Sequence, residues 1–214
     1  MKILNLYAGI GGNRKLWGDE HEITAVENVP EIAKIYQDFF PKDKVIVADA
    51  HQYLLDHYDE FDFIWSSPPC PSHSRINFST RRKLDFPDMK LYEEVIFLKH
   101  WFKGKWVVEN VISYYDPLIK PQKTQKHYFW SNFDITRFNG ERIKVRNDVG
   151  ETCDVKMKAK GMLVKKWYNY KGDKRTLLNN AIEGELGLHI FNCAFNNKQT
   201  NINTLFGKKS ENPL

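Results

Sequence analysis

The chain reads Phe61-Asp62-Phe63-Ile64-Trp65 and, two serines later, Pro68-Pro69-Cys70. An apolar run of this length predicts a central β-strand. Two prolines then stop the chain from continuing as sheet or entering a helix, because each fixes φ and lacks an N–H. The cysteine is therefore expected on a rigid turn at the carboxyl end of a strand, where open α/β sheets bind their ligands. This position favours a nucleophile over a buried structural thiol.

The segments on either side alternate between strand and helix patterns. We expect strands at 2–7, 22–27, 44–48, 61–65 and 106–108, and helices at 13–17, 30–39, 51–55 and 87–102. Such alternation predicts parallel βαβ units and a Rossmann-like, doubly wound α/β fold with a mostly parallel sheet.

The second half of the chain has a different texture. Residues 134–175 are polar and lysine-rich with regularly spaced glycines, which predicts a small β-rich insertion. An apolar helical pattern returns over 177–195 and is expected to pack back on the first domain. The tail from Lys208 is expected to be disordered. We therefore predict a catalytic domain at 1–133, an insertion at 134–175 and a returning segment at 176–214.

Composition limits the class of protein. A length of 214 residues suits one α/β domain with a small insertion. Three cysteines, widely spaced, form neither a disulfide framework nor a zinc pattern, so we expect no metal and a reducing cytoplasm. No apolar run approaches the length of a membrane span. The net charge of +5 is compatible with a polyanionic partner.

Basic residues gather at two places. Arg75, Arg81 and Arg82 follow the cysteine, and lysines at 156, 158, 160, 165 and 166 lie close in sequence to Trp167, Tyr168 and Tyr170. Basic side chains between aromatic ones suit phosphate contact and base stacking. A solvated lysine-rich surface explains the second cluster, taken alone, equally well.

A glycine-rich turn, Ala8-Gly9-Ile10-Gly11-Gly12, follows the first strand. Glycines between a strand and a helix let the backbone approach a ligand closely. Glu27 ends the second strand, where an acidic residue binds the ribose hydroxyls of a nucleoside cofactor. Asp49 ends the third strand and is placed to accept a hydrogen bond from an adenine amino group. Together these residues predict a nucleoside pocket.

Cys70 and Glu109 end the fourth and fifth strands, so parallel pairing would bring them to one crevice. A thiolate beside a carboxylate is unfavourable unless the acid is protonated or engaged by substrate. The pair suits attack on a ring that the acid polarises through a hydrogen bond. His73 lies close in sequence, so a Cys–His pair stays open as an alternative.

These motifs, taken in order, resemble the DNA cytosine-5 methyltransferases, especially small bacterial and phage-type members. The segments that carry the resemblance are the cofactor loop 6–12, the acidic residues 27 and 49, the catalytic loop 67–70, the Glu-Asn-Val motif 109–111, the basic segment 126–133 and the closing motif 178–182. The chain departs from the family pattern at Pro71, where glutamine is usual, at Lys126-His127, where arginine is usual, and at 182–184.

The resemblance implies a class I S-adenosylmethionine-dependent methyltransferase fold whose insertion is a small target-recognition region. It implies transfer of a methyl group from S-adenosylmethionine to C5 of a flipped cytosine in double-stranded DNA, through a covalent bond from Cys70 to C6. S-adenosylhomocysteine would be the product, and no metal is implied. We expect a monomer in a bacterial or phage-infected cell, in a role such as restriction-modification, with short or relaxed sequence specificity.

The resemblance also assigns residues. The catalytic set is Cys70, Glu109, Lys126 and His127. The cofactor set is Leu6, Tyr7, Ala8, Gly9, Gly11, Gly12, Glu27, Asn28, Asp49, Ala50, Pro68 and Asn180. The DNA-binding set is Ser72, Arg75, Arg81, Arg82, Lys156, Lys158, Lys165 and Lys166.

Three other functions stay open at this point. Some relatives modify cytosine in tRNA, and nothing in the residues identifies a 2′-hydroxyl contact. A catalytically silent binding module is a second alternative, although it need keep neither Cys70 nor Glu109. A nicotinamide-dependent dehydrogenase also has a glycine turn, but leaves the Pro-Pro-Cys and Glu-Asn-Val turns unexplained.

Overall fold

The computed structural model describes residues 1–75, 86–140 and 152–195. Its centre is a seven-stranded sheet in the order β3-β2-β1-β4-β5-β7-β6. The first five of these strands are parallel, and β7 runs antiparallel to both of its neighbours. The strands are β1 (Lys2–Leu6), β2 (Glu22–Val26), β3 (Lys44–Ile46), β4 (Phe63–Ser66), β5 (Lys105–Val111), β6 (Gln122–Thr124) and β7 (His127–Ser131).

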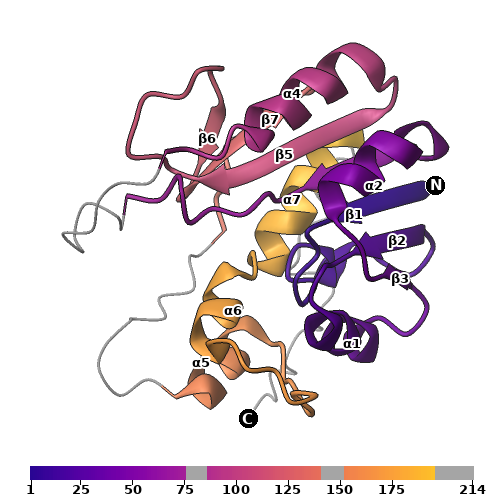
Figure 1. Ribbon diagram of the computed structural model, residues 1–214, viewed down its shortest axis with the longest axis vertical. Coiled ribbons are helices and arrows are strands. Elements are labelled where there is room, and N and C mark those ends of the chain that lie inside the picture. Colours follow the sequence, from indigo (N-terminus) through magenta and orange to yellow (C-terminus); the bar gives the residue numbers. More distant parts are fainter. Residues whose placement is uncertain (76–85, 141–151, 196–214) are drawn as a thin grey trace, which may run out of the picture.

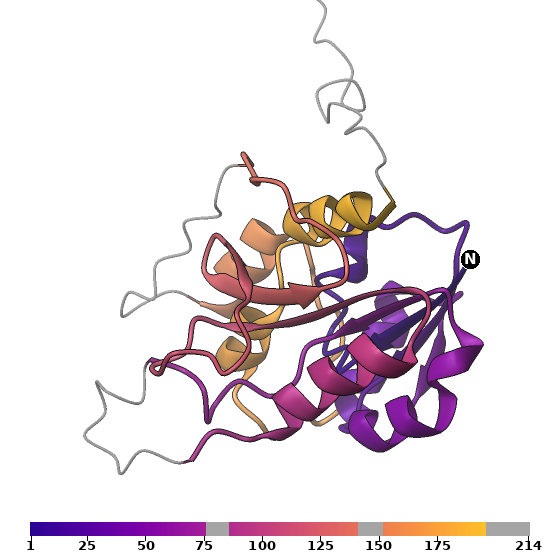
Figure 2. The same ribbon diagram turned by 90° about the horizontal axis from the view of Figure 1, so that it is seen from above.

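Helices cover both faces of this sheet. Figure 2 shows α2 and α4 on one side of the strands and α7 on the other. The α-helices are α1 (Pro30–Phe39), α2 (Ala50–His57), α4 (Lys90–Trp101), α5 (Cys153–Lys160), α6 (Lys174–Asn180) and α7 (Gly184–Phe195), and two short 3₁₀ turns are η1 (Arg14–Leu16) and η2 (Tyr58–Glu60).

The strand sequences explain the two layers, because successive side chains point to opposite faces. Leu4 and Leu6 of β1 pack in one cluster with Leu54 of α2 and with α4. Ile3 of the same strand packs in another cluster with Ile190 and the rest of α7. Strands buried on both faces read as continuous apolar runs, as the stretch at 63–65 does.

The strand order places the ligand site. The sheet grows outward from β1 in one direction through β2 and in the other through β4. Crevices form at such a reversal, beyond the carboxyl ends of the strands. Cys70 lies in the loop that leaves β4 at this point, and the glycine turn leaves β1 beside it.

The doubly wound, mostly parallel sheet and its five parallel strands are confirmed, with ends that shift by up to three residues. The hairpin of β6 and β7 was not expected (Figure 1). The β-rich character expected for 134–175 is wrong for the described part of that segment, which holds α5 and no strand. The predicted apolar helix at 177–195 is two helices, α6 and α7, separated at Ala181–Glu183. Arg81, Arg82 and the tail from Lys208 lie outside the described residues.

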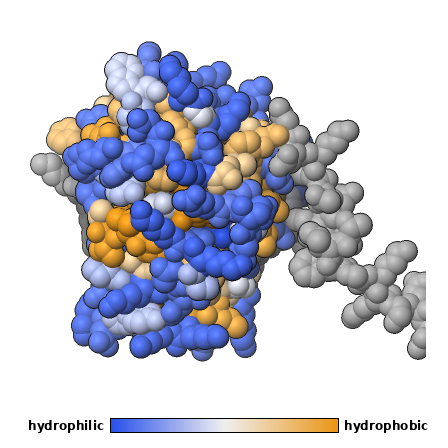
Figure 3. Space-filling view, turned by 90° about the vertical axis from the view of Figure 1, so that its right-hand side faces the viewer, coloured by the Kyte–Doolittle hydropathy of each residue, from blue (hydrophilic) through white to orange (hydrophobic). Residues whose placement is uncertain are grey.

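The surface gives no sign of a membrane-spanning element. Within the described ranges, every helix is too short or too polar to cross a bilayer. The face drawn in Figure 3 is mostly hydrophilic, and its hydrophobic areas are separated by polar side chains. Scattered apolar side chains of this kind are normal on folded domains.

Candidate active site

A cavity of about 370 Å³ opens at the carboxyl edge of the sheet. Its size is in the range of small-molecule and cofactor sites. The loops after β1, β2, β4 and β5 form one wall, and the segment from Tyr170 to Ile182 forms another. Of the residues predicted for the site, the lining includes Tyr7, Ala8, Gly9, Gly12, Glu27, Asn28, Pro68, Cys70, Glu109, His127 and Asn180.

The glycine turn is held open by backbone geometry and by Glu27. Gly9 has φ of 55° and Gly11 has φ of 80°, a left-handed conformation that favours glycine. Glu27 Oε2 accepts a hydrogen bond from the Gly9 N–H at 3.0 Å, and its Oε1 accepts one from the Val29 N–H at 2.9 Å. Burial raises the pKa of Glu27. The acid predicted to hold ribose therefore also fixes the glycine turn.

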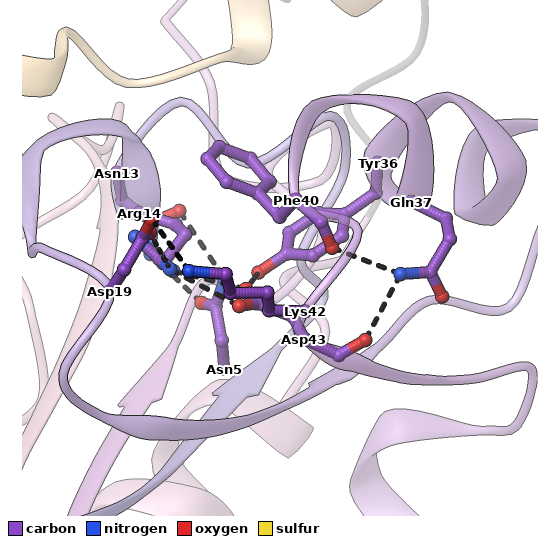
Figure 4. Close-up of polar contacts among 9 residues, drawn as sticks. All are labelled: Asn5, Asn13, Arg14, Asp19, Tyr36, Gln37, Phe40, Lys42 and Asp43. Atoms are coloured by element: carbon purple, nitrogen blue, oxygen red, sulfur yellow. Dashed lines mark hydrogen bonds and ion pairs between the residues drawn. The ribbon is translucent and has the colours of Figure 1, made fainter.

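The residues just after this turn rest on a buried polar network, shown in Figure 4. Asn13 Nδ2 donates to Asn5 Oδ1 at 2.8 Å, which ties the turn to β1. Arg14 Nε donates to Asp43 Oδ2 at 3.0 Å, and the Tyr36 hydroxyl donates to the same oxygen at 2.8 Å. These side chains are almost fully buried. A paired and hydrogen-bonded buried charge of this kind holds its partners in one arrangement.

A second buried acid supports the site from α4. Glu94 is fully buried, and its Oε1 accepts a hydrogen bond from the Tyr7 hydroxyl at 2.6 Å. Its Oε2 accepts one from the Ser66 hydroxyl at 2.5 Å, and His51 Nδ1 lies 3.1 Å from Oε1. Burial, followed by the charge of Glu94, strongly raises the pKa of Tyr7. Glu94 thus connects Tyr7, which precedes the glycine turn, with Ser66 at the end of β4, four residues before Cys70.

The Cys70 thiol lies in the same cavity as the Glu109 carboxyl. Burial, with the nearby charge of Glu109, raises the pKa of Cys70 above its ordinary value. The loop that carries the thiol is fastened to β5, because Asn110 Nδ2 donates to the Pro68 carbonyl at 2.9 Å. The expected proximity of acid and thiol is therefore present in the structure.

His127 contacts Glu109 directly. Its Nδ1 lies 2.6 Å from Glu109 Oε1, across the antiparallel pairing of β5 and β7. Lys126 occupies the tight turn between β6 and β7, where its side chain is exposed. Of the two residues expected in place of the family's arginine, His127 is the one that lines the cavity.

His73 is committed to another partner. Its ring is nearly inaccessible, and its Nδ1 lies 2.6 Å from the Tyr115 hydroxyl. Its hydrogen bond to Cys70 comes from the backbone: the His73 N–H donates to the Cys70 carbonyl at 3.0 Å. Burial lowers the pKa of His73. No side-chain contact joins His73 to Cys70, so the geometry does not support a Cys–His pair. His73 instead supports the loop that carries Cys70.

Four predicted cofactor residues lie outside the cavity lining in the described chain: Leu6, Gly11, Asp49 and Ala50. Asp49 is exposed, and its Oδ1 accepts the Gln52 N–H at 2.9 Å as the cap of α2. Sequence reasoning missed Thr176 and placed Tyr170 only among the aromatic residues of the lysine-rich cluster, yet both line the cavity. Neither follows an apolar strand, so no local pattern marked them as cofactor residues.

The predicted DNA-binding residues divide into two groups. Lys158, Lys165 and Lys166 are exposed, as is Arg75, whose Nε donates to the Ser113 carbonyl at 2.9 Å. Lys156 is only 3% exposed, and its Nζ donates to Asn179 Oδ1 at 2.9 Å. The expectation of a phosphate contact from Lys156 is corrected, because burial leaves it no surface for one.

Ser72 is half-buried, and its hydroxyl accepts the Asp88 N–H at 3.0 Å. The described residues contain no cluster of metal-binding side chains.

A sequence profile identifies the family. The profile for C-5 cytosine-specific DNA methylases matches residues 1–113, from β1 to just past the Glu-Asn-Val motif. This chain belongs to that family. The match spans the glycine turn, Cys70 and Glu109, all of which contribute to the lining of the cavity. No protein with a curated description matches the sequence.

A solved structure shares the fold of this chain. The Entamoeba histolytica methyltransferase EhMeth is 10% identical, with a TM-score of 0.55 over 92% of this chain and 98% of that one. A mutant of DNMT2 from Spodoptera frugiperda is 20% identical, with a TM-score of 0.44 over 65% of this chain and 53% of that one. The likeness to EhMeth shows a common class I methyltransferase fold.

Proposed function

We propose that the protein methylates C5 of cytosine in double-stranded DNA with S-adenosylmethionine as donor. The observation that carries this proposal is the meeting of Cys70, Glu109 and His127 in the cavity that the glycine turn also lines. A nucleophile, an acid and a nucleoside-type loop in one cavity suit methylation of a ring that must first be activated.

The cavity fits the cofactor. A Cβ at Gly9 would meet no atom within 4 Å, so there is open space beside this turn. Gly9, Glu27 and Asn28 would hold the nucleoside, with Asn180 on the opposite wall. When bound, S-adenosylmethionine supplies an electrophilic methyl group.

The chain's own residues then activate the base. The sulfur of the Cys70 thiolate forms a bond to C6, and the electron pair of the C5–C6 double bond makes C5 nucleophilic. The protonated carboxyl of Glu109 donates a hydrogen bond to N3, and its other oxygen accepts one from the exocyclic amine. These bonds stabilise the negative charge that develops in the ring. After C5 is methylated, loss of its proton and release of the Cys70 thiolate restore the double bond.

His127 positions Glu109 in this scheme. Its contact at 2.6 Å fixes the carboxyl toward the base and leaves the imidazole near the substrate. The raised pKa of the resting Cys70 thiol is consistent with this scheme. A substrate that engages Glu109 would remove the repulsion that disfavours the thiolate.

A cytosine can reach this cavity only outside the duplex stack, so the proposal includes base flipping. Arg75, Lys158, Lys165 and Lys166 are the described basic side chains proposed to contact phosphates. The segment 134–175 is proposed to recognise the target. This segment is short compared with the protein modules that read base edges, which supports a short recognition sequence or relaxed specificity.

The test is methyl transfer from tritium-labelled S-adenosylmethionine to unmethylated duplex DNA and, separately, to a tRNA pool. We expect label in DNA, dependent on Cys70, and bisulfite sequencing should place it on cytosines in a short context. Label in RNA alone would establish the RNA alternative instead. Label in neither substrate would refute methylation of both, and a long, strictly recognised DNA site would refute relaxed specificity.

A further inference from the structure

The end of α5 and the segment between α5 and α6 pack against the glycine turn and α1. Met157, Met162 and Val164 share one apolar cluster with Ile10 of the glycine turn and Ile32 of α1. Figure 1 shows α5 and α6 side by side near α1, apart from the β6–β7 hairpin. The part of the expected recognition region that follows residue 152 therefore packs against the glycine turn and α1, which carry part of the cavity lining.

A strained turn in this segment reaches the cavity. Tyr168 has φ of 49° and Asn169 has φ of 63°, and the Tyr170 N–H donates to the Trp167 carbonyl at 2.8 Å. Two consecutive non-glycine residues in the left-handed region cost free energy and persist only when the surroundings hold them. Here the Tyr168 hydroxyl donates to the Asp38 carboxylate of α1 at 2.8 Å.

Tyr170, the next residue, lines the cavity together with Gly9, Glu27 and Thr176. Its pKa is raised by partial burial, then by the charges of Asp173 and Glu27. Space for its ring depends on Gly172, because a Cβ there would collide with the Tyr170 hydroxyl. Tyr170 is thus placed beside Glu27, the acid predicted to hold ribose, by the turn at 168–169 and by the space that Gly172 leaves.

We propose that Tyr170 is a cofactor-binding residue that contacts the adenosine half of the methyl donor beside Glu27. This inference rests on the proposed function. An aromatic ring offers a flat apolar face to a purine, and its hydroxyl adds a polar contact at the rim. The segment expected to recognise DNA therefore also completes the cofactor site.

The neighbouring aromatic rings are differently engaged. Lys174 Nζ lies 4.9 Å from the centre of the Trp167 ring, and Lys166 Nζ lies 4.7 Å from that of Tyr168. Cations over ring faces stabilise the turn. Among these three aromatic residues, Tyr170 is the one that lines the cavity.

The test is the affinity of the full chain for S-adenosylhomocysteine, measured by isothermal titration calorimetry. Tyr170→Ala should weaken binding about tenfold, the scale of a lost base–aromatic stack. Tyr170→Phe should keep most of the affinity, because it keeps the ring. Gly172→Ala should also weaken binding, because the added methyl group displaces the Tyr170 ring without removing it. The matched control is Tyr53→Ala, a half-buried tyrosine of α2 outside the cavity lining.

The outcomes separate this inference from the proposed function. If the wild-type protein binds S-adenosylhomocysteine and Tyr170→Ala and Gly172→Ala bind it equally well, the proposed role of Tyr170 is overturned. Wild-type protein that does not bind it overturns the proposed cofactor itself. If Tyr170→Ala fails to fold, as judged by its thermal unfolding against Tyr53→Ala, Gly172→Ala at an exposed position decides the question alone.

Discussion

The two walls of the cavity are built in different ways. The sheet wall consists of turns that leave parallel strands, and each turn is tied to a buried partner. Glu27 holds Gly9, Asn110 holds the Pro68 carbonyl, and Glu94 holds Tyr7. The second wall, from Tyr170 to Ile182, is an exposed turn followed by a short helix, fastened by an apolar cluster and a few surface bonds.

The difference separates the two tasks of the site. Bond formation needs groups held in one geometry, and we propose that Cys70, Glu109 and His127 are these groups. Cys70 follows β4, and Glu109 and His127 lie on the paired strands β5 and β7. Enclosing a cofactor needs surface area and the ability to open, which a turn on an apolar cluster can supply. We therefore expect substitutions in the sheet wall to affect turnover or folding, and those in the second wall to affect affinity.

The largest effect is expected at Cys70. Cys70→Ser should reduce methyl transfer on the order of 10⁴-fold or more, as removal of an enzyme's nucleophile does. Its affinity for S-adenosylhomocysteine should stay unchanged, because the cofactor residues remain. Transfer assays and calorimetry measure the two quantities. Cys193→Ser, a half-buried thiol of α7, is the control and should keep full activity. Residual transfer near the wild-type rate in Cys70→Ser would refute the nucleophile.

The support behind the glycine turn should be the next most sensitive. Asp43→Ala leaves Arg14 buried without its main partner, which costs about 3–5 kcal/mol of unfolding free energy. Urea unfolding measures this loss. Asp19→Ala removes the exposed partner of the same arginine and should cost about 1 kcal/mol or less. Equal losses in the two variants would show that the buried pair does not support the turn.

A smaller loss is expected for Tyr7→Phe. It removes the hydroxyl that donates to Glu94 and should cost about 1–3 kcal/mol, because a buried acceptor loses a donor. The same unfolding assay applies, with Tyr53→Phe as the half-buried control. A Tyr7→Phe protein as stable as wild type would mean that the Glu94 network does not depend on this bond.

The smallest effect is a shift in thiol reactivity. The thiolate is the reactive form, so a raised pKa predicts that alkylation of Cys70 by iodoacetamide increases with pH into the alkaline range. Glu109→Gln removes the repelling charge and should move this profile to lower pH. The measurement is made with Cys153 and Cys193 replaced by serine, and Glu185→Gln, an exposed acid of α7, serves as control. An unshifted profile would show that Glu109 does not act on the thiol.

The sheet wall could be predicted from sequence because its chemistry follows strands. Cys70 and Glu109 each come after an apolar run, and parallel pairing brings such positions together. The same reasoning placed Glu27 correctly. It failed for Asp49, whose position after a short edge strand is equally that of a helix cap.

The rest could not be predicted because it depends on distant partners. Glu94 lies on a helix that reads as ordinary amphipathic sequence, and only the folded structure brings Tyr7, 87 positions earlier, to its carboxylate. The β6–β7 hairpin was missed because β6 has only three residues and directly follows Pro121. Tyr170 enters the cavity through two left-handed residues that no sequence pattern announces.

The most direct measurement of the central claim is covalent trapping on duplex DNA containing 5-fluorocytosine. Fluorine at C5 blocks the last proton loss, so the bond from Cys70 to C6 persists after methyl transfer. Mass spectrometry should show the intact chain joined to the methylated strand only when S-adenosylmethionine is present, and Cys70→Ser should show no adduct. Absence of an adduct with 5-fluorocytosine in both DNA and RNA would contradict the account, and would identify the protein as a binding module.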